Sequence, residues 1–275
     1  MDYFSWNVRY KVIAAGFLFY SAVFLLCHVV SACFAQTYRS LSAKGKVFWD
    51  LAATRAEFGI HSAIAGLWAL LVDPVISADK VTTQQNWSWF TLLIATGFFL
   101  FENVALHGSN LVFRTFNLPL VIHHFFAFAG FTGAVIWDTI GHYLPIVALL
   151  LEMSTPFTCI SWIFLKVGWS KTVFWKANQW LMIHMFHCRM VLTYHMWWVS
   201  WCHWDEIKEK FALPWCVIFF TGLVLLAVIL NPVWTHKKTM QLLNPVDWNC
   251  GNKPAPENGP LPSVKQDGQL PKKVS

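Results

Sequence analysis

Charged residues are scarce in this sequence. Asp, Glu, Lys and Arg make up 12% of its 275 residues, whereas a soluble domain has about 25%. Hydrophobic residues make up 56%, and apolar runs recur along almost the whole chain, which excludes an ordinary soluble domain. We therefore predict an all-α fold, a polytopic membrane bundle of about seven transmembrane helices.

Several motifs of catalysis and binding are missing as well. The chain has no G-x-S-x-G and no Gly-rich phosphate loop, which argues against a hydrolase of that type and against a nucleotide site. Its seven cysteines form no C-x-x-C, so they predict small buried side chains rather than disulfides or a zinc site. The net charge of +6 comes from short loops and the tail, so nucleic acid is not an expected partner.

Seven apolar stretches are long enough to cross a membrane, which takes about 20 residues. The third and seventh are clear. The second, fifth and sixth carry charges or histidines, so an alternative with five spans stays open. We expect spans over residues 12–34, 51–72, 87–107, 118–137, 141–166, 176–200 and 212–233.

Basic residues predict how these spans are oriented. Alternate loops, together with the tail, hold most of the 20 Lys and Arg residues, and loops rich in basic residues stay in the cytosol. We expect a lumenal N-terminus (1–11), a transmembrane domain (12–240) and a cytosolic tail (241–275). The tail ends with Lys272 and Lys273 followed by two further residues, Val274 and Ser275. That spacing fits a dilysine retrieval signal, an address read by the COPI coat.

A pair of histidines, His123 and His124, lies inside the fourth span. Ionisable side chains in hydrocarbon are costly and suggest function. Adjacent helical residues point about 100° apart, so one imidazole can line a chamber while the other is fixed by a neighbouring helix. An imidazole held by a carboxylate can act as base or nucleophile. The catalytic candidates for acyl transfer are His123, His124 and Glu152, and the expected chamber lining is Glu57, Glu102, His184, His187 and Arg189.

Two other interpretations of the buried charges stay open. They can hold helices together, with Arg55 paired to Glu57 or Glu102 and Arg189 paired to Glu152. A di-iron oxidase would need repeated histidine boxes, and the chain has one H-x-x-H and one isolated pair. We therefore expect no metal and no bound cofactor. Acyl-CoA would be the co-substrate, and its anionic carrier would be attracted by Arg114, Lys166 and Lys171.

Several long runs of residues resemble a known family. They are His123-His124, the run Glu152-Met153-Ser154-Thr155-Pro156-Phe157, and Arg189 in the sixth span. Residues 46–56, 97–104, 178–190 and 234–238 extend the likeness over about residues 5–250. The chain resembles the TLC domain, the family of the ceramide synthases, the translocon-associated TRAM proteins and several lipid-regulating proteins.

The resemblance implies residence in the endoplasmic reticulum membrane with cycling to the ER-Golgi intermediate compartment. It implies a cargo receptor that exports newly made lysosomal enzymes through the COPII coat and supports lysosome biogenesis. It also implies a part in ceramide and phospholipid homeostasis, membrane lipids as partners, and a homodimer as one option. The lumenal loops expected at 73–86, 138–140 and 201–211 are short for a receptor.

The alternative is an acyl-CoA-dependent lipid acyltransferase. The family's histidine pair carries over onto His123 and His124. Ceramide synthases follow that pair with an H-D-x-x-D stretch, where this chain keeps one carboxylate, Glu152. The acceptor would be a sphingoid base or, since the second acid is replaced, a lysophospholipid such as lysophosphatidylglycerol.

Overall fold

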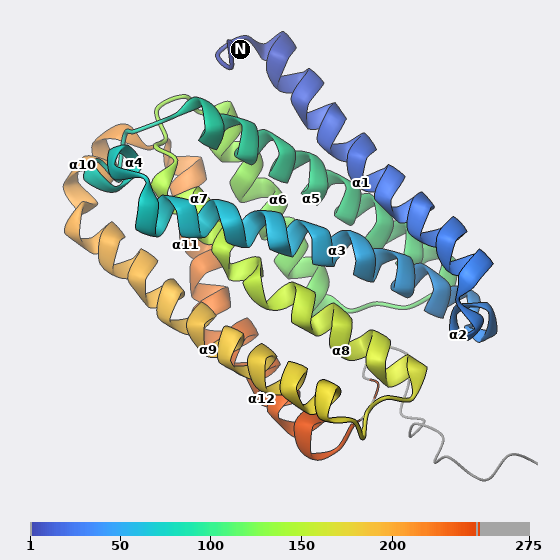
Figure 1. Ribbon diagram of the computed structural model, residues 1–275. Coiled ribbons are helices and arrows are strands. Elements are labelled where there is room, and N and C mark those ends of the chain that lie inside the picture. Colours follow the sequence, from blue (N-terminus) through green and yellow to red (C-terminus); the bar gives the residue numbers. More distant parts are fainter. Residues whose placement is uncertain (1, 246, 248–275) are drawn as a thin grey trace, which may run out of the picture.

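The computed structural model describes residues 2–245 and 247, and the described part is built almost entirely from helices (Figure 1). The predicted all-α membrane bundle is confirmed. Lys272 and Lys273 lie outside the described residues. The helices, in chain order, are α1 (Trp6–Phe34), α2 (Gln36–Ser40), α3 (Ala43–Leu67), α4 (Pro74–Ala78), α5 (Asn86–Phe113), α6 (Leu118–Ile136), α7 (Tyr143–Leu149), α8 (Thr155–Val167), α9 (Val173–Cys202), α10 (Trp204–Lys210), α11 (Leu213–Leu225) and α12 (Asn231–Leu243).

Three short segments modify the longer helices. The π-helical η1 (Trp68–Val72) extends α3, and the π-helical η3 (Leu226–Leu230) joins α11 to α12. The 3-10 segment η2 (Leu150–Ser154) joins α7 to α8.

Five of the resulting rods are apolar enough to be recognised as spans by length and hydropathy. They are α1, α5, α6, α7–η2–α8 and α11–η3–α12. The two remaining rods, α3 and α9, have 25 and 30 residues, which at 1.5 Å per residue exceeds the roughly 30 Å of a bilayer core. Both contain charged residues, such as Arg55 in α3 and Arg189 in α9, which lower their mean hydropathy. The count of seven spans therefore stays a prediction.

Helix α5 lies at the centre of the bundle. Buried residues make up 67% of its apolar window, against 17% for α1, and it packs on α1, α3 and α6. Its approach to α1 is very close at Gly97, where a Cβ atom would lie 2.4 Å from the carbonyl oxygen of Ile13. A small residue is required there, as is common between membrane helices.

The break between α7 and α8 has a clear cause in the sequence. Pro156 has no N–H to donate to the carbonyl of Glu152, and the chain tightens into η2 before it. Helix α3 presses against this break at Gly59, where a Cβ atom would meet Pro156 Cδ at 2.6 Å and the Glu152 carbonyl oxygen at 2.9 Å. Glu152 therefore sits on a fixed, irregular turn in the middle of a membrane rod.

One end of the bundle is held by a buried arginine. Arg9 is fully buried and donates to the carbonyl oxygens of Tyr3 (2.6 Å) and Val135 (2.7 Å) and to Asp138 Oδ1 (2.5 Å). Its guanidinium also lies 4.4 Å from the ring centre of Trp89. These contacts join α1, α5 and the end of α6. The N-terminus lies at this end and α12 at the other (Figure 1).

Candidate functional site

The centre of the candidate site is a histidine–carboxylate pair on two different rods. His123, in the second turn of α6, places Nε2 3.3 Å from Oε1 of Glu152 in η2, and each side chain is 13% exposed. Thr155 donates to the other oxygen, Oε2, at 2.6 Å. A carboxylate that faces Nε2–H of an imidazole leaves Nδ1 as the proton acceptor. The pair therefore has the arrangement of an oriented general base.

The adjacent His124 lies in a different environment. It is 6% exposed, and its Nε2 is 3.6 Å from Oε1 of the fully buried Glu102. The same Glu102 oxygen accepts a hydrogen bond from Arg55 Nε at 2.9 Å, and Nη2 of Arg55 also contacts it. Asn103 donates to the His124 carbonyl at 3.2 Å. His124 is thus held against α5. Of the two partners considered for Arg55, Glu57 and Glu102, the structure pairs it with Glu102.

A second buried cation, Arg189 of α9, faces the pair. Arg189 is 3% exposed, donates from Nη1 to Ser154 Oγ at 2.9 Å, and interacts electrostatically with Glu152. Its Nε and Nη2 have no hydrogen-bond partner within the described residues. The guanidinium lies 5.5 Å from the ring centre of Trp234, whose ring is edge-on to His123 at 5.3 Å. Arg189 can thus offer the N–H groups of two nitrogens, Nε and Nη2, to an anion.

These groups line a polar hollow of roughly 1380 Å³, counting the part open to the outside. It lies between α3, the start of α6, α8, α9 and α12. The cations on its wall are Arg55, Arg189, Lys237 and Lys238, whereas its acidic lining is Glu152. Because cations outnumber carboxylates on its wall, the hollow favours an anionic ligand.

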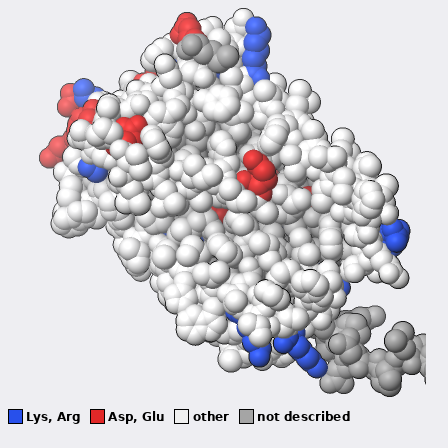
Figure 2. Space-filling view, viewed as in Figure 1, with Lys and Arg blue, Asp and Glu red and all other residues white. Residues whose placement is uncertain are grey.

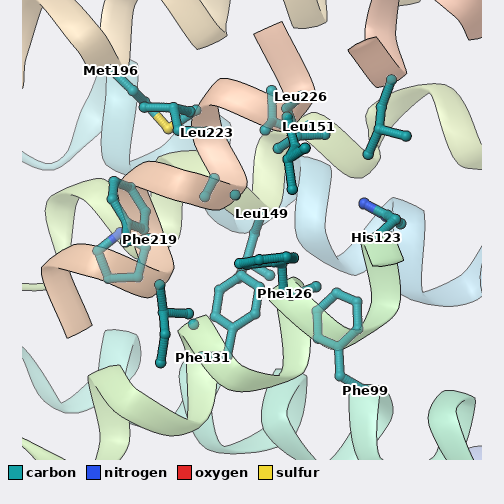
Figure 3. Close-up of a pocket in the computed structure, with 18 of the residues that line it drawn as sticks. Phe99, His123, Phe126, Phe131, Leu149, Leu151, Met196, Phe219, Leu223 and Leu226 are labelled. Atoms are coloured by element: carbon teal, nitrogen blue, oxygen red, sulfur yellow. The ribbon is translucent and has the colours of Figure 1, made fainter. Parts of the chain in front are cut away.

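A second hollow of about 750 Å³ lies on the other side of the pair, between α6, α7 and α11. Its wall is apolar except for His123 and Glu152, the two residues that both hollows share. Figure 3 shows His123 at one end of this apolar hollow, with Met196 and Phe219 at the other. The oriented base thus stands where a polar compartment meets an apolar one.

The predicted convergence of His123, His124 and Glu152 is found, with Glu102 and Arg189 beside them. Of the five residues expected to line the chamber, Arg189 lines the polar hollow, whereas Glu102 lies behind His124 and does not reach the wall. The other three lie farther from the chamber. His184 and His187 are exposed on the outer face of α9, each bonding through Nδ1 to a carbonyl four residues earlier. Glu57 is not part of the polar wall and interacts with Tyr20 of α1.

Helix geometry explains these errors. His187 is two residues before Arg189, and Glu57 is two residues after Arg55, so each pair points about 200° apart on its helix. Once both arginines turn toward the polar hollow, His187 and Glu57 face away from it, His187 to the outside and Glu57 to α1.

Three cations of the wall are not among the predicted site residues. They are Arg55, Lys237 and Lys238. The signal for the two lysines is a basic pair shortly after the last predicted span, which ends at residue 233. Of the residues expected to attract the carrier, Arg114, Lys166 and Lys171 do not line the hollow, and Lys166 pairs with Asp247. Among residues 2–245 and 247, no three His, Cys, Asp or Glu side chains cluster as a metal site requires.

Comparison with known proteins identifies relatives of this chain. The family model of the TLC domain matches residues 49–238. Protein CLN8 of Mus musculus is 60% identical over 99% of this chain and 94% of its own length, and Protein CLN8 of Homo sapiens is 62% identical over 95% and 93%. TLC domain-containing protein 4 of Xenopus tropicalis is 26% identical over 58% of this chain and 61% of its own length. No solved structure gives a significant match. The likeness predicted from the sequence runs is confirmed.

Proposed function

This chain belongs to the TLC domain family, and we propose that it is a lipid acyltransferase of the endoplasmic reticulum membrane that uses acyl-CoA. The observation that carries the proposal is the position of His123 and Glu152, the two residues shared by a cationic hollow and an apolar one. Acyl transfer from coenzyme A to a lipid joins a highly charged carrier to hydrocarbon chains. A base at the meeting point of these two environments suits that reaction.

The reaction then follows from the residues in place. Glu152 keeps the proton of His123 on Nε2, and Nδ1 accepts the proton of the acceptor hydroxyl. The hydroxyl oxygen attacks the thioester carbon, a C–O bond forms and the C–S bond breaks. His123 returns the proton to the departing thiolate, so coenzyme A leaves as the thiol. The free N–H groups of Arg189 would stabilise the oxyanion formed on the way.

The charge of the polar hollow favours one class of acceptor. A sphingoid base carries an ammonium group, which the Arg55, Arg189, Lys237 and Lys238 side chains would repel. A lysophospholipid such as lysophosphatidylglycerol carries a phosphodiester, which these cations would attract. We therefore place lysophospholipids ahead of sphingoid bases.

The test uses purified full-length protein in lipid nanodiscs with oleoyl-CoA. Lysophosphatidylglycerol and sphinganine are supplied in separate reactions, and products are measured by mass spectrometry. We expect acylation of lysophosphatidylglycerol. Acylation of sphinganine alone would overturn the choice of acceptor. The absence of acylated product with both acceptors would overturn the proposed acyltransferase activity.

We further propose that the protein cycles between the endoplasmic reticulum and the Golgi and carries newly made lysosomal enzymes out of the endoplasmic reticulum. The positions of the charges favour an orientation with α12 at the cytosolic end of the bundle and α10 at the lumenal end. Figure 2 shows acidic side chains mixed with a few basic ones over the end with α4 and α10, whereas the charged side chains at the opposite end of this face are basic. With the basic end in the cytosol, α10 and its Asp205, Glu206, Lys208 and Lys210 would face lumenal cargo.

Changing both Lys272 and Lys273 to alanine should move the protein forward to the Golgi, as seen by microscopy against compartment markers. An unchanged distribution would contradict the retrieval signal. Charge reversal across α10 should lower the recovery of lysosomal enzymes with the protein after cross-linking, and unchanged recovery would contradict the receptor role of that surface.

A further inference from the structure

The apolar hollow has the length of a hydrocarbon chain in one leaflet. Its wall on α11 and η3 runs from Ile218 to Leu230, which is about 18 Å along a helix. One leaflet contributes about 15 Å of a roughly 30 Å hydrocarbon core. A chain that lies flat in one leaflet would therefore fit along this wall.

The chemistry of the wall points to the same occupant. His123 and Glu152 are its ionisable residues, and the remainder of the wall is made of aromatic and aliphatic side chains with glycines. An apolar cavity of this kind does not hold water well and binds apolar ligands. In Figure 3 the imidazole of His123 stands at one end and the rings of Phe126 and Phe131 line the middle.

Two glycines leave this hollow open. Gly130 of α6 lies seven residues beyond His123, which is about 10 Å along the helix, and a Cβ atom there would meet nothing within 4 Å. Gly222 of α11 faces Phe126, whose Cβ would be 3.4 Å from an added Cβ. A side chain at Gly130 would thus start in open space, with no neighbour within 4 Å of its Cβ atom.

We propose that the apolar hollow holds the hydrocarbon chain of the transferred acyl group, with its carbonyl carbon at His123, and that the absence of a side chain at Gly130 determines how long a chain is accepted. This proposal rests on the acyl transfer proposed above. It assigns the two hollows different tasks, since the polar one receives the charged carrier and acceptor. Chain length is then measured from His123 along α6 toward Phe131.

The first experiment changes the length of the hollow. Gly130→Leu is compared with the unaltered protein in the nanodisc assay, with palmitoyl-CoA and decanoyl-CoA as competing donors. A few methylenes that no longer fit cost at least about tenfold in selectivity, so the ratio of palmitoyl to decanoyl product should fall by about that factor or more. An unchanged ratio would overturn the role of Gly130.

Gly108→Leu is the matched control. Gly108 is also a helical glycine with nothing within 4 Å of an added Cβ, but it is exposed on α5 and lines neither hollow. Its variant should keep the selectivity of the unaltered protein. An equal shift in this control would show that the effect comes from adding leucine to a membrane helix and would overturn the proposal.

A second experiment needs no turnover and so separates this proposal from the enzyme itself. A photoreactive palmitoyl-CoA analogue, with the reactive group near the end of its chain, is cross-linked to the full-length protein, and labelled peptides are identified by mass spectrometry. We expect labels on α6 near Phe131 and on α11 near Phe219, and a loss of most labelling in Gly130→Leu. Labelling confined to outward-facing residues would overturn the chain site even if the protein transfers acyl groups.

Discussion

Replacing Glu152 by glutamine tests whether the negative charge of Glu152 stabilises the buried Arg189 beside it. Glutamine keeps the size of the side chain and can still accept a hydrogen bond from Thr155. It removes the negative charge beside Arg189, which is 3% exposed. Arg189 is hydrogen-bonded to Ser154 and interacts with Glu152 only through space, so leaving its buried charge uncompensated should cost about 3 kcal/mol, the lower end of the range for a broken buried ion pair. At roughly 2–4 °C per kcal/mol for a chain of this size, the melting temperature in detergent should fall by about 10 °C.

A double variant separates stability from chemistry. Changing Arg189 to methionine in the Glu152→Gln background removes the uncompensated cation, so most of the lost stability should return. The coupling free energy between the two positions should be about 1–3 kcal/mol. Acyl transfer should stay lower by about 10²–10⁴ in both variants, because the base has lost its orienting carboxylate.

The assays are thermal unfolding in detergent micelles and product formation in nanodiscs. An unchanged melting temperature in Glu152→Gln, or losses that simply add in the double variant, would contradict the electrostatic interaction between Glu152 and Arg189. Return of activity together with stability would contradict the chemical role of the carboxylate.

Three further predictions concern the scaffold, each checked by thermal unfolding in detergent. Arg9→Gly removes three hydrogen bonds of a charged donor, including that to Asp138, and should lower the free energy of unfolding by about 3 kcal/mol or more. Gly97→Val brings a side chain against the backbone of Ile13 and should cost roughly 3 kcal/mol, since α1 must move away from α5. Burial raises the pKa of Asp79, but hydrogen bonds from Thr82 and the backbone outweigh burial and lower the pKa to about 2, against an ordinary value of 3.8. Because the folded pKa is depressed, Asp79 stabilises the fold above about pH 4 and loses this effect as the pH falls toward 2, so Asp79→Asn should lower the melting temperature at neutral pH and not at pH 2.

Matched controls exist for the first two scaffold variants. Arg39→Gly changes an exposed arginine that bonds only to carbonyls of α1, and Gly108→Val adds a side chain at an open position. Losses as large in these controls would contradict the packing arguments. For Asp79, an equal effect of the substitution at both pH values would contradict the depressed pKa.

Much of the fold could be predicted from apolar runs. The expected spans at 118–137 and 141–166 correspond to α6 and α7–η2–α8 with small shifts at their ends. The runs could not reveal the 3-10 turn at η2, because hydropathy does not record backbone hydrogen bonds. The proline at 156 was visible, but its effect on Glu152 depends on how α3 packs against the turn.

The candidate site could be predicted only in part. Ionisable side chains in hydrocarbon are costly in free energy, and this identified His123, His124 and Glu152 as candidates. That cost does not say which face of a helix points into the bundle. On α9 the buried stripe passes through Met182, Phe186 and Arg189, and its rotation is set by tertiary packing. The spacing of His184 and His187 predicts that they share one helix face, but it does not say which one, and the packing of Arg189 assigns them to the outer face.

The most direct test of the central claim compares two histidines in one assay. His123→Ala removes the imidazole between the hollows, and His184→Ala removes an outward-facing one on α9. Both proteins are purified in nanodiscs and supplied with oleoyl-CoA and lysophosphatidylglycerol. We predict that His123→Ala forms product at least about 100-fold more slowly, with a melting temperature close to that of the unaltered protein, and that His184→Ala keeps full activity. Equal activity of the two variants would contradict the assignment of His123 as the base.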